Sequence, residues 1–252
     1  MGWAVLLGRV LLAVGLGAIG ALNIAFGGFG SGLEPAPAAL PPQLGYVTGA
    51  ILLIAGLGVL VNFRARTAAF VLAGVLLLWL AVFQAIFLFS QPFNAGLTTP
   101  ALEVLALFGA CLILAGTLGG AHKERLITPG RFLFALTLPA FGALHYLYID
   151  YVASVIPAWI PNPVFWGYAT GVAHAAAGLS LLTGVLARLA APLLGIMFGS
   201  WVLILHIPRV IADSANRNEW TSLFVATALC GGAWLVAGTL KQPEKGAPHP
   251  ES

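Results

Sequence analysis

The sequence carries very little charge for its length. Of its 252 residues only 8% are Asp, Glu, Lys or Arg, whereas 60% are hydrophobic. A soluble domain carries roughly 25% charged residues, so these few charges cannot cover the surface of a water-soluble protein of this size. The low charge excludes a soluble two-domain enzyme, and the high hydrophobicity excludes a disordered chain. An integral membrane protein with several spans remains.

Cysteine and reaction motifs are scarce as well. Cys111 and Cys230 stand singly inside apolar segments without a CxxC partner, which excludes a disulfide framework and a zinc–cysteine site. The sequence has no HxxxH, HExxH or CxxCH motif, no Walker A motif, and no GxGxxG that follows a strand. The basic residues are scattered singly between apolar runs, so the net charge of +3 does not indicate nucleic-acid binding.

Long apolar runs are what the sequence has in abundance. A helix needs about 20 apolar residues to cross a bilayer, with a usable range of roughly 17 to 25. Pro-, Gly- and Arg-containing turns separate eight runs of this kind. We therefore expect an all-α polytopic membrane protein with eight transmembrane helices, over residues 8–27, 45–62, 67–89, 100–118, 131–149, 165–186, 189–207 and 220–240.

The two halves of the chain repeat each other. A shift of 122 residues aligns residues 45–49 (GYVTG) with 167–171 (GYATG), and 115–118 (AGTL) with 237–240 (AGTL). Without any gap, about 35 of about 111 aligned pairs are identical, against roughly 10% by chance. The sequence therefore predicts two four-helix repeats, at 1–119 and 130–240. Residues 120–129 would be a cytoplasmic linker, and residues 241–252 a disordered cytoplasmic tail.

Basic residues give the orientation. Four spans per repeat is an even number, so both repeats share one orientation, as parallel repeats do. With both termini inside, nine Lys and Arg residues fall on the inner side, whereas only Arg209 and Arg217 fall outside. We expect a multi-pass protein of the bacterial inner membrane with a cytoplasmic N-terminus and C-terminus.

The second repeat holds the candidate site. Placing an ionisable side chain inside the bilayer costs free energy, so such residues are the first candidates for a functional site. His145, His174 and His206 all fall in the outer half of their predicted spans, whereas the first repeat has Asn23, Leu52 and Gln84 at the aligned positions. This asymmetry predicts a cofactor-binding site in the second repeat, formed by His145, His174, His206, Tyr146, Trp201 and Arg209. Glu103, the lone deep acid of the first repeat, could pair with a histidine or with Arg209.

Several chemistries suit such a histidine cluster. Imidazole can hydrogen-bond a quinone and relay its protons, and it can bind b-type haem iron or another metal, here through His145 and His174. The bland alternative, in which these imidazoles only donate to nearby carbonyls, stays open. Two outer segments flank the site. We expect residues 155–161 to lie on the surface over the mouth of the bundle, and residues 206–220 to dock a periplasmic partner or to form a solvated loop.

The repeat unit resembles the DoxX family of small membrane proteins. The resemblance rests on Arg131 at the start of a span, on residues 141–145 (FGALH), on residues 156–161 (IPAWIP), on the Gly171–Gly178 span and on residues 187–191 (ARLAA). It covers most of 130–240 and extends more loosely to 8–118. The family implies a four-helix membrane unit, and some relatives are linked to a quinol oxidase or to thiosulfate:quinone oxidoreduction.

Three functions are compatible with these features. The leading hypothesis is a subunit of a membrane redox or respiratory system with a quinone- or haem-type site at the histidines. The alternatives are a non-catalytic structural or assembly subunit and, less favoured because no span pair is interrupted at the midplane, a small-molecule transporter. The expected partners are the lipid bilayer and other membrane or periplasmic subunits, with no nucleic acid.

Overall fold

The computed structural model describes residues 2–30, 33–34, 40–85, 94–119 and 123–240. Within these residues every regular element is a helix and none is a strand. The longer elements are α1 (Trp3–Ala25), α2 (Leu44–Leu60), α3 (Ala65–Trp79), α5 (Ala95–Thr117), α6 (Glu124–Leu147), α8 (Pro163–Thr183), α9 (Ala187–Trp201) and α11 (Arg217–Thr239). The shorter ones are the π-helices η1 (Leu80–Gln84) and η2 (Val202–His206) and the α-helices α7 (Ile149–Val155) and α10 (Ile207–Ala212).

Each of the eight predicted spans overlaps one of the longer helices. Six of the described helices are long and apolar enough to cross a membrane, which confirms an all-helical membrane protein. They are Trp3–Ala25, Ala65–Gln84, Gly96–Thr117, Glu124–Leu147, Ala187–Ala212 and Arg217–Thr239. Helix α2, with 17 residues, is shorter, and α8 is not one of the six. The predicted linker lies partly, and the predicted tail entirely, outside the described residues.

Several helix ends follow from local sequence. Asn94 and Asn216 cap α5 and α11, since each side-chain oxygen accepts the backbone N–H two residues later, which satisfies an otherwise orphaned donor. Arg64 and Leu186 precede α3 and α9 in the left-handed region, with φ of 44° and 55°. This backbone reverses the chain sharply, so α2 and α3, like α8 and α9, are joined by tight turns.

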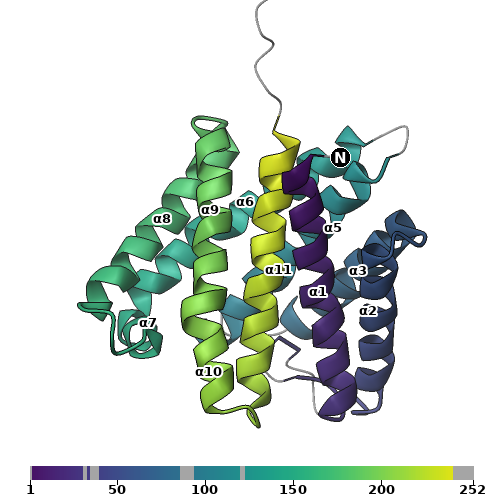
Figure 1. Ribbon diagram of the computed structural model, residues 1–252, viewed down its shortest axis with the longest axis horizontal. Helices are drawn as coiled ribbons and strands as arrows, with labels where there is room; N and C mark the ends of the chain where they lie inside the picture. Colours follow the sequence, from purple (N-terminus) through teal and green to yellow (C-terminus); the bar gives the residue numbers. More distant parts are fainter. Residues whose placement is uncertain (1, 31–32, 35–39, 86–93, 120–122, 241–252) are drawn as a thin grey trace, which may run out of the picture.

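Small residues allow the closest helix contacts. Helices α1 and α11 lie side by side at the centre of the bundle (Figure 1), and α5 packs in the same intimate way on α6. A Cβ atom on Gly231 would lie 2.4 Å from the Leu12 backbone nitrogen, and one on Gly109 would lie 2.6 Å from the Gly130 carbonyl oxygen. These backbones approach to distances that only glycine permits, as expected for helices that associate in lipid.

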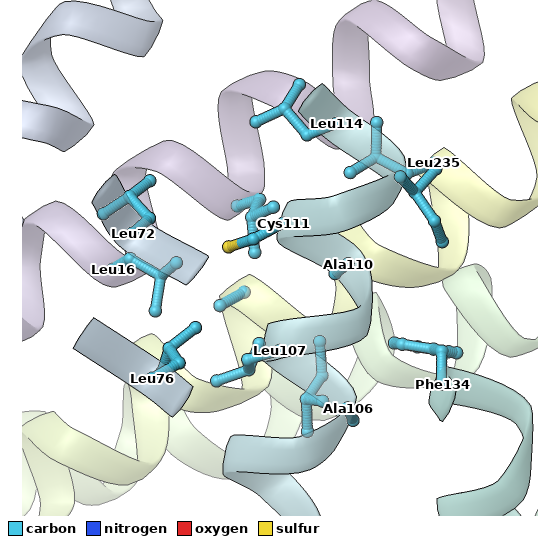
Figure 2. Packing of buried hydrophobic residues seen from close by; sticks show 14 of the residues in the cluster. Leu16, Leu72, Leu76, Ala106, Leu107, Ala110, Cys111, Leu114, Phe134 and Leu235 are labelled. Atoms are coloured by element: carbon cyan, nitrogen blue, oxygen red, sulfur yellow. The ribbon is translucent and has the colours of Figure 1, made fainter. Parts of the chain in front are cut away.

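The apolar core lies where α3, α5 and α11 meet. Cys111, Leu107 and Leu114 of α5 are fully buried against Leu72 and Leu76 of α3 (Figure 2). Both cysteines are free and buried. In Figure 1 the start of α1 and the end of α11 lie at one end of the bundle, and α7 and α10 lie at the opposite end. We call this opposite end the α7 end.

Candidate functional site

A cavity of about 1040 Å³ opens at the α7 end, within the second half of the chain. Its walls come from α6, α7, α8, α9, η2 and α11, and the first half contributes one wall through the beginning of α5. The lining is mostly apolar and aromatic. The polar side chains that face it belong chiefly to His145, His206, Glu103, Ser200 and Thr170. This volume lies at the upper end of the roughly 300–1,000 Å³ typical of small-molecule sites.

His145, His174 and Trp201 form a cluster of contacting rings beside the cavity. The ring centroids of the two histidines are 4.9 Å apart, and each lies within 6.1 Å of the Trp201 ring. His174 is 1% exposed and stands behind the wall, whereas His145 and Trp201 line the cavity. The structure therefore brings together three of the predicted residues, two of which a ligand can touch.

Backbone hydrogen bonds fix the tautomer of both clustered imidazoles. The Nδ1 of His145 lies 2.8 Å from the Phe141 carbonyl oxygen, and that of His174 lies 3.0 Å from the Thr170 carbonyl oxygen. A carbonyl oxygen only accepts, so each Nδ1 carries the proton and donates it. In the neutral ring, Nε2 is then left as an acceptor. His145 can therefore accept a hydrogen bond from a hydroxyl group in the cavity.

The π-helix η2 brings His206 to the same cavity as Trp201. These two residues are five positions apart in the sequence, and in an α-helix their side chains would point about 140° apart. The η2 turn is closed instead by the hydrogen bond from the Ile207 N–H to the Val202 carbonyl, and such a wide turn returns residues five apart to one face. The Nδ1 of His206 is buried and has no hydrogen-bond partner among the described residues.

Glu103 places a carboxyl group in the opposite wall. It lines the cavity from α5 and makes no hydrogen bond or ion pair that involves the described residues. Its predicted pairing with a histidine or with Arg209 is therefore not observed in this part of the chain. Arg209 instead forms a bidentate ion pair with Glu219, with N–O distances of 2.7 Å.

Besides His174, which stands behind the wall, two of the predicted site residues lie outside the cavity. Tyr146 is exposed and packs on Tyr168, with ring centroids 4.9 Å apart. Arg209 stands on α10, where Glu219 occupies its guanidinium. No Lys or Arg side chain is part of the cavity lining formed by the described residues. The wall therefore provides a carboxyl group and imidazoles but no fixed positive charge.

The outer segments differ from their predicted form in detail. The surface helix is α7, which ends at Val155, the first residue of the 155–161 segment, and has no buried residue. Val155, Ile156 and Ile160 nevertheless face the cavity, so this stretch covers it as expected. The 206–220 segment holds itself together through the Arg209–Glu219 pair and a hydrogen bond from Trp220 Nε1 to the Ser214 carbonyl oxygen.

The two clustered imidazoles do not fit a haem held between them. Aromatic rings with centroids 4.9 Å apart are in direct contact, so no porphyrin plane can lie between His145 and His174. Among the described residues no group of three or more His, Cys, Asp and Glu side chains could hold a metal ion.

The first half contains a polar cluster at the same end of the bundle. Glu34, only 2% exposed, accepts hydrogen bonds from Asn23 Nδ2 at 2.9 Å and from the Gly30 N–H at 3.0 Å. Arg217 of α11 donates to Asn23 Oδ1 at 2.7 Å and to the Gly28 carbonyl oxygen at 2.8 Å. The alignment singled out Asn23, but the sequence analysis did not place Glu34 or Arg217 in a site. The contact of Arg217 with Asn23 joins residues 194 positions apart.

Burial raises the pKa of Glu34 to about 7, although its hydrogen bonds and the charge of Arg217 lower it in part. A raised pKa means that the folded chain binds the proton more tightly than the unfolded chain. The resulting stabilisation is complete below a pH of about 4.5 and is lost as the pH rises through 7. We expect roughly 3 kcal/mol from this group at pH 4.5 to be absent at pH 8.

Thermal unfolding in detergent between pH 4.5 and pH 8 measures this effect. The melting temperature of the wild type should fall over this interval relative to that of Glu34→Gln, whose side chain does not titrate. Parallel pH profiles for the two proteins would contradict the assignment to Glu34.

No family model, curated protein or solved structure matches the chain.

Proposed function

We propose that the protein is a DoxX-like membrane protein that binds a quinone or quinol for a membrane redox system, through the cavity at the α7 end. The observation that carries the proposal is the combination of apolar walls with His145, His206 and Glu103 around about 1040 Å³. A quinone ring needs flat apolar contacts, and its two oxygen atoms need hydrogen-bond partners. Indole and phenol rings supply the first, and imidazoles supply the second.

The charge of the cavity wall supports a neutral ligand. The lining contains no Lys or Arg among the described residues, so an anionic ligand would meet Glu103 without a countercharge. A neutral quinone avoids this cost, because it places no charge in a desolvated site. The imidazole of His145, whose Nδ1 is bonded to Phe141, suits the hydroxyl group of the reduced quinol.

Two parallel four-helix repeats are part of the proposal. The structural details that recur after 122 residues support it. The π-helix of residues 80–84 recurs at 202–206, the left-handed residue 64 at 186, and the Asn cap 94 at 216. The contact of Gly20 with Gly49 likewise recurs between Gly142 and Gly171. In this arrangement α2 and α8 cross the membrane together with the six helices that are long and apolar enough to span it.

We further propose that both termini face the cytoplasm and that the cavity faces the outer leaflet of a bacterial inner membrane. Arg64, Arg66 and Arg188 flank the tight turns that lie toward the end of the bundle where α1 starts and α11 finishes. Arg209 and Arg217 lie toward the α7 end, and Arg209 is neutralised by Glu219. This distribution agrees with an excess of basic residues on the cytoplasmic side.

Binding of a short-chain benzoquinone to the purified protein in lipid nanodiscs tests the function. We expect His206→Gln to weaken binding of the benzoquinone, and His145→Asn to weaken binding of its reduced quinol, about tenfold each, since His206 would donate to a quinone oxygen and His145 would accept from a quinol hydroxyl group. Both substitutions introduce the residue that the first half carries at the aligned position, so the helices should accommodate them.

Thr183→Ala is the matched control, because Thr183 is exposed at the end of α8 far from the cavity. It should bind the quinone like the wild type. The proposal fails if the wild-type protein binds no benzoquinone and yields no quinone on solvent extraction. It also fails if both histidine variants bind as tightly as the control.

A further inference from the structure

The first half fills, with its own chain, the space that corresponds to the cavity. Leu33 is 1% exposed and belongs to the apolar core, next to the buried carboxyl of Glu34. Two side chains, which we call the hosts, donate hydrogen bonds to oxygen atoms of this segment. Gln84 Nε2 donates to the Leu33 carbonyl oxygen at 3.0 Å, and Asn23 Nδ2 donates to Glu34 Oε1 at 2.9 Å. Residues 33–34 therefore form an internal plug.

The hosts of this plug are the counterparts of the cavity histidines. A shift of 122 residues takes Asn23 to His145 and Gln84 to His206. Gln84 ends the π-helix η1, as His206 ends η2. Gln84 Oε1 and His206 Nδ1 are both buried without a partner among the described residues. Each half therefore has a polar side chain at the same two aligned positions, Asn23 and Gln84 in the first half and His145 and His206 in the second.

In the second half, the residues aligned with Leu33 and Glu34 are not buried as Leu33 and Glu34 are. The shift takes Leu33 to Val155 and Glu34 to Ile156. Both of these residues stay partly exposed and face the cavity from its edge. The second half therefore keeps the polar hosts but leaves their shared space empty of chain.

We propose that the ligand of the second half takes the place that Leu33 and Glu34 take in the first, with one oxygen atom on His206 and a second on His145. The inference rests on the proposed function, and it names the ligand as a quinol, a neutral ring compound whose two hydroxyl groups can both accept and donate a hydrogen bond. His206 replaces the Gln84 donor to a carbonyl-type oxygen. His145, with its Nδ1 bonded to Phe141, accepts from a hydroxyl group.

Charge distinguishes the two occupants. The carboxyl of Glu34 lies near Arg217, which is hydrogen-bonded to Asn23 in the first half. The sequence counterpart of Arg217 is Ala95, which has no charge to offer. Arg217 thus offsets the charge of the acidic Glu34 in the first half, whereas the second half lacks this arginine and suits a neutral ligand.

A plug variant tests the inference. It combines His145→Asn, Val155→Leu, Ile156→Gln and His206→Gln, which install the residues of the first half with a neutral amide in place of Glu34. The readout is the reaction of Met197→Cys, a substitution in the cavity wall, with N-ethylmaleimide. We expect the plug variant to slow this reaction at least tenfold and to abolish benzoquinone binding.

Val75→Cys is the matched control, since Val75 is the buried counterpart of Met197. It should react slowly in the wild-type background and faster after Leu33→Ala, which removes part of the internal plug. The wild-type chain, whose two cysteines are buried, gives the blank, and gel filtration verifies that each variant is folded.

The outcomes separate the inference from the proposed function. Unchanged labelling of Met197→Cys in a folded plug variant overturns the inference, even if the wild type binds benzoquinone. So does a Leu33→Ala variant that leaves Val75→Cys unreactive. Slowed labelling together with a wild type that binds no benzoquinone overturns the proposed function, while it supports the correspondence between the plug position and the cavity.

Discussion

Gly231→Val is expected to lower the free energy of unfolding by about 3 kcal/mol or to prevent folding altogether, because overpacking a tight contact forces backbone shifts. A Cβ atom at this position would lie 2.4 Å from the Leu12 nitrogen and 2.8 Å from the Gly8 carbonyl oxygen. Both are backbone atoms, so no side chain can swing away and α1 must separate from α11. Van der Waals packing is a main source of helix association in lipid, and this separation forfeits it.

Gly74→Val is the matched control for this prediction. Gly74 lies in the middle of α3, and a Cβ atom there meets nothing within 4 Å. The control should unfold within about 0.5 kcal/mol of the wild type. Unfolding by heat or by increasing SDS in mixed micelles measures both variants. Equal losses in the two variants would show that the α1–α11 contact is not special.

Arg217→Met is expected to destabilise the protein by about 3 kcal/mol at pH 8, where Glu34 is ionised. The substitution removes the hydrogen bonds to Asn23 Oδ1 and the Gly28 carbonyl oxygen, and hydrogen bonds from charged groups contribute about 1.5–3 kcal/mol each. It also leaves the buried Glu34 carboxylate without a nearby positive charge. The first half should lose its plug before the rest of the bundle unfolds.

Glu34→Gln should rescue part of this loss, because it removes the charge that Arg217 offsets. A double-mutant cycle measures the coupling between the two residues. Arg209→Met, which breaks the partly exposed pair with Glu219, should cost at most about 1 kcal/mol. An Arg217→Met protein as stable as Arg209→Met would contradict the role of Arg217.

Apolar runs were sufficient to predict where the helices lie. The run at 45–62 corresponds to α2 (Leu44–Leu60), and the run at 220–240 corresponds to α11 (Arg217–Thr239). Such segments are continuous in the chain, and their hydrophobicity alone decides their state in a membrane. Helix α7 was not predicted as a helix, since its seven residues are too few to carry a periodic signal.

The site could be predicted only in part. The gapless alignment pointed to His145, His174 and His206, because a difference between repeats is visible in the letters themselves. The cavity was not predictable, since it depends on whether residues 155–156 fold inward as residues 33–34 do. Arg217 contacts Asn23 across 194 positions, and no local pattern encodes a contact of that separation. Tyr146 was included because of its neighbours in sequence, but α6 turns it away from the cavity.

The π-helix η2 also constrains the length of the chain. A π turn is a stretch of helix with one residue more than an α-helix of the same shape requires. Removing one residue from 202–205 would leave Trp201 and His206 four apart, still on one face of an ordinary helix. Removing one residue earlier in α9 would instead rotate everything beyond it by about 100° against the turn that α9 shares with α8. The second half therefore contains one residue more than an uninterrupted α-helix would need, and this extra residue lies in η2, next to the cavity.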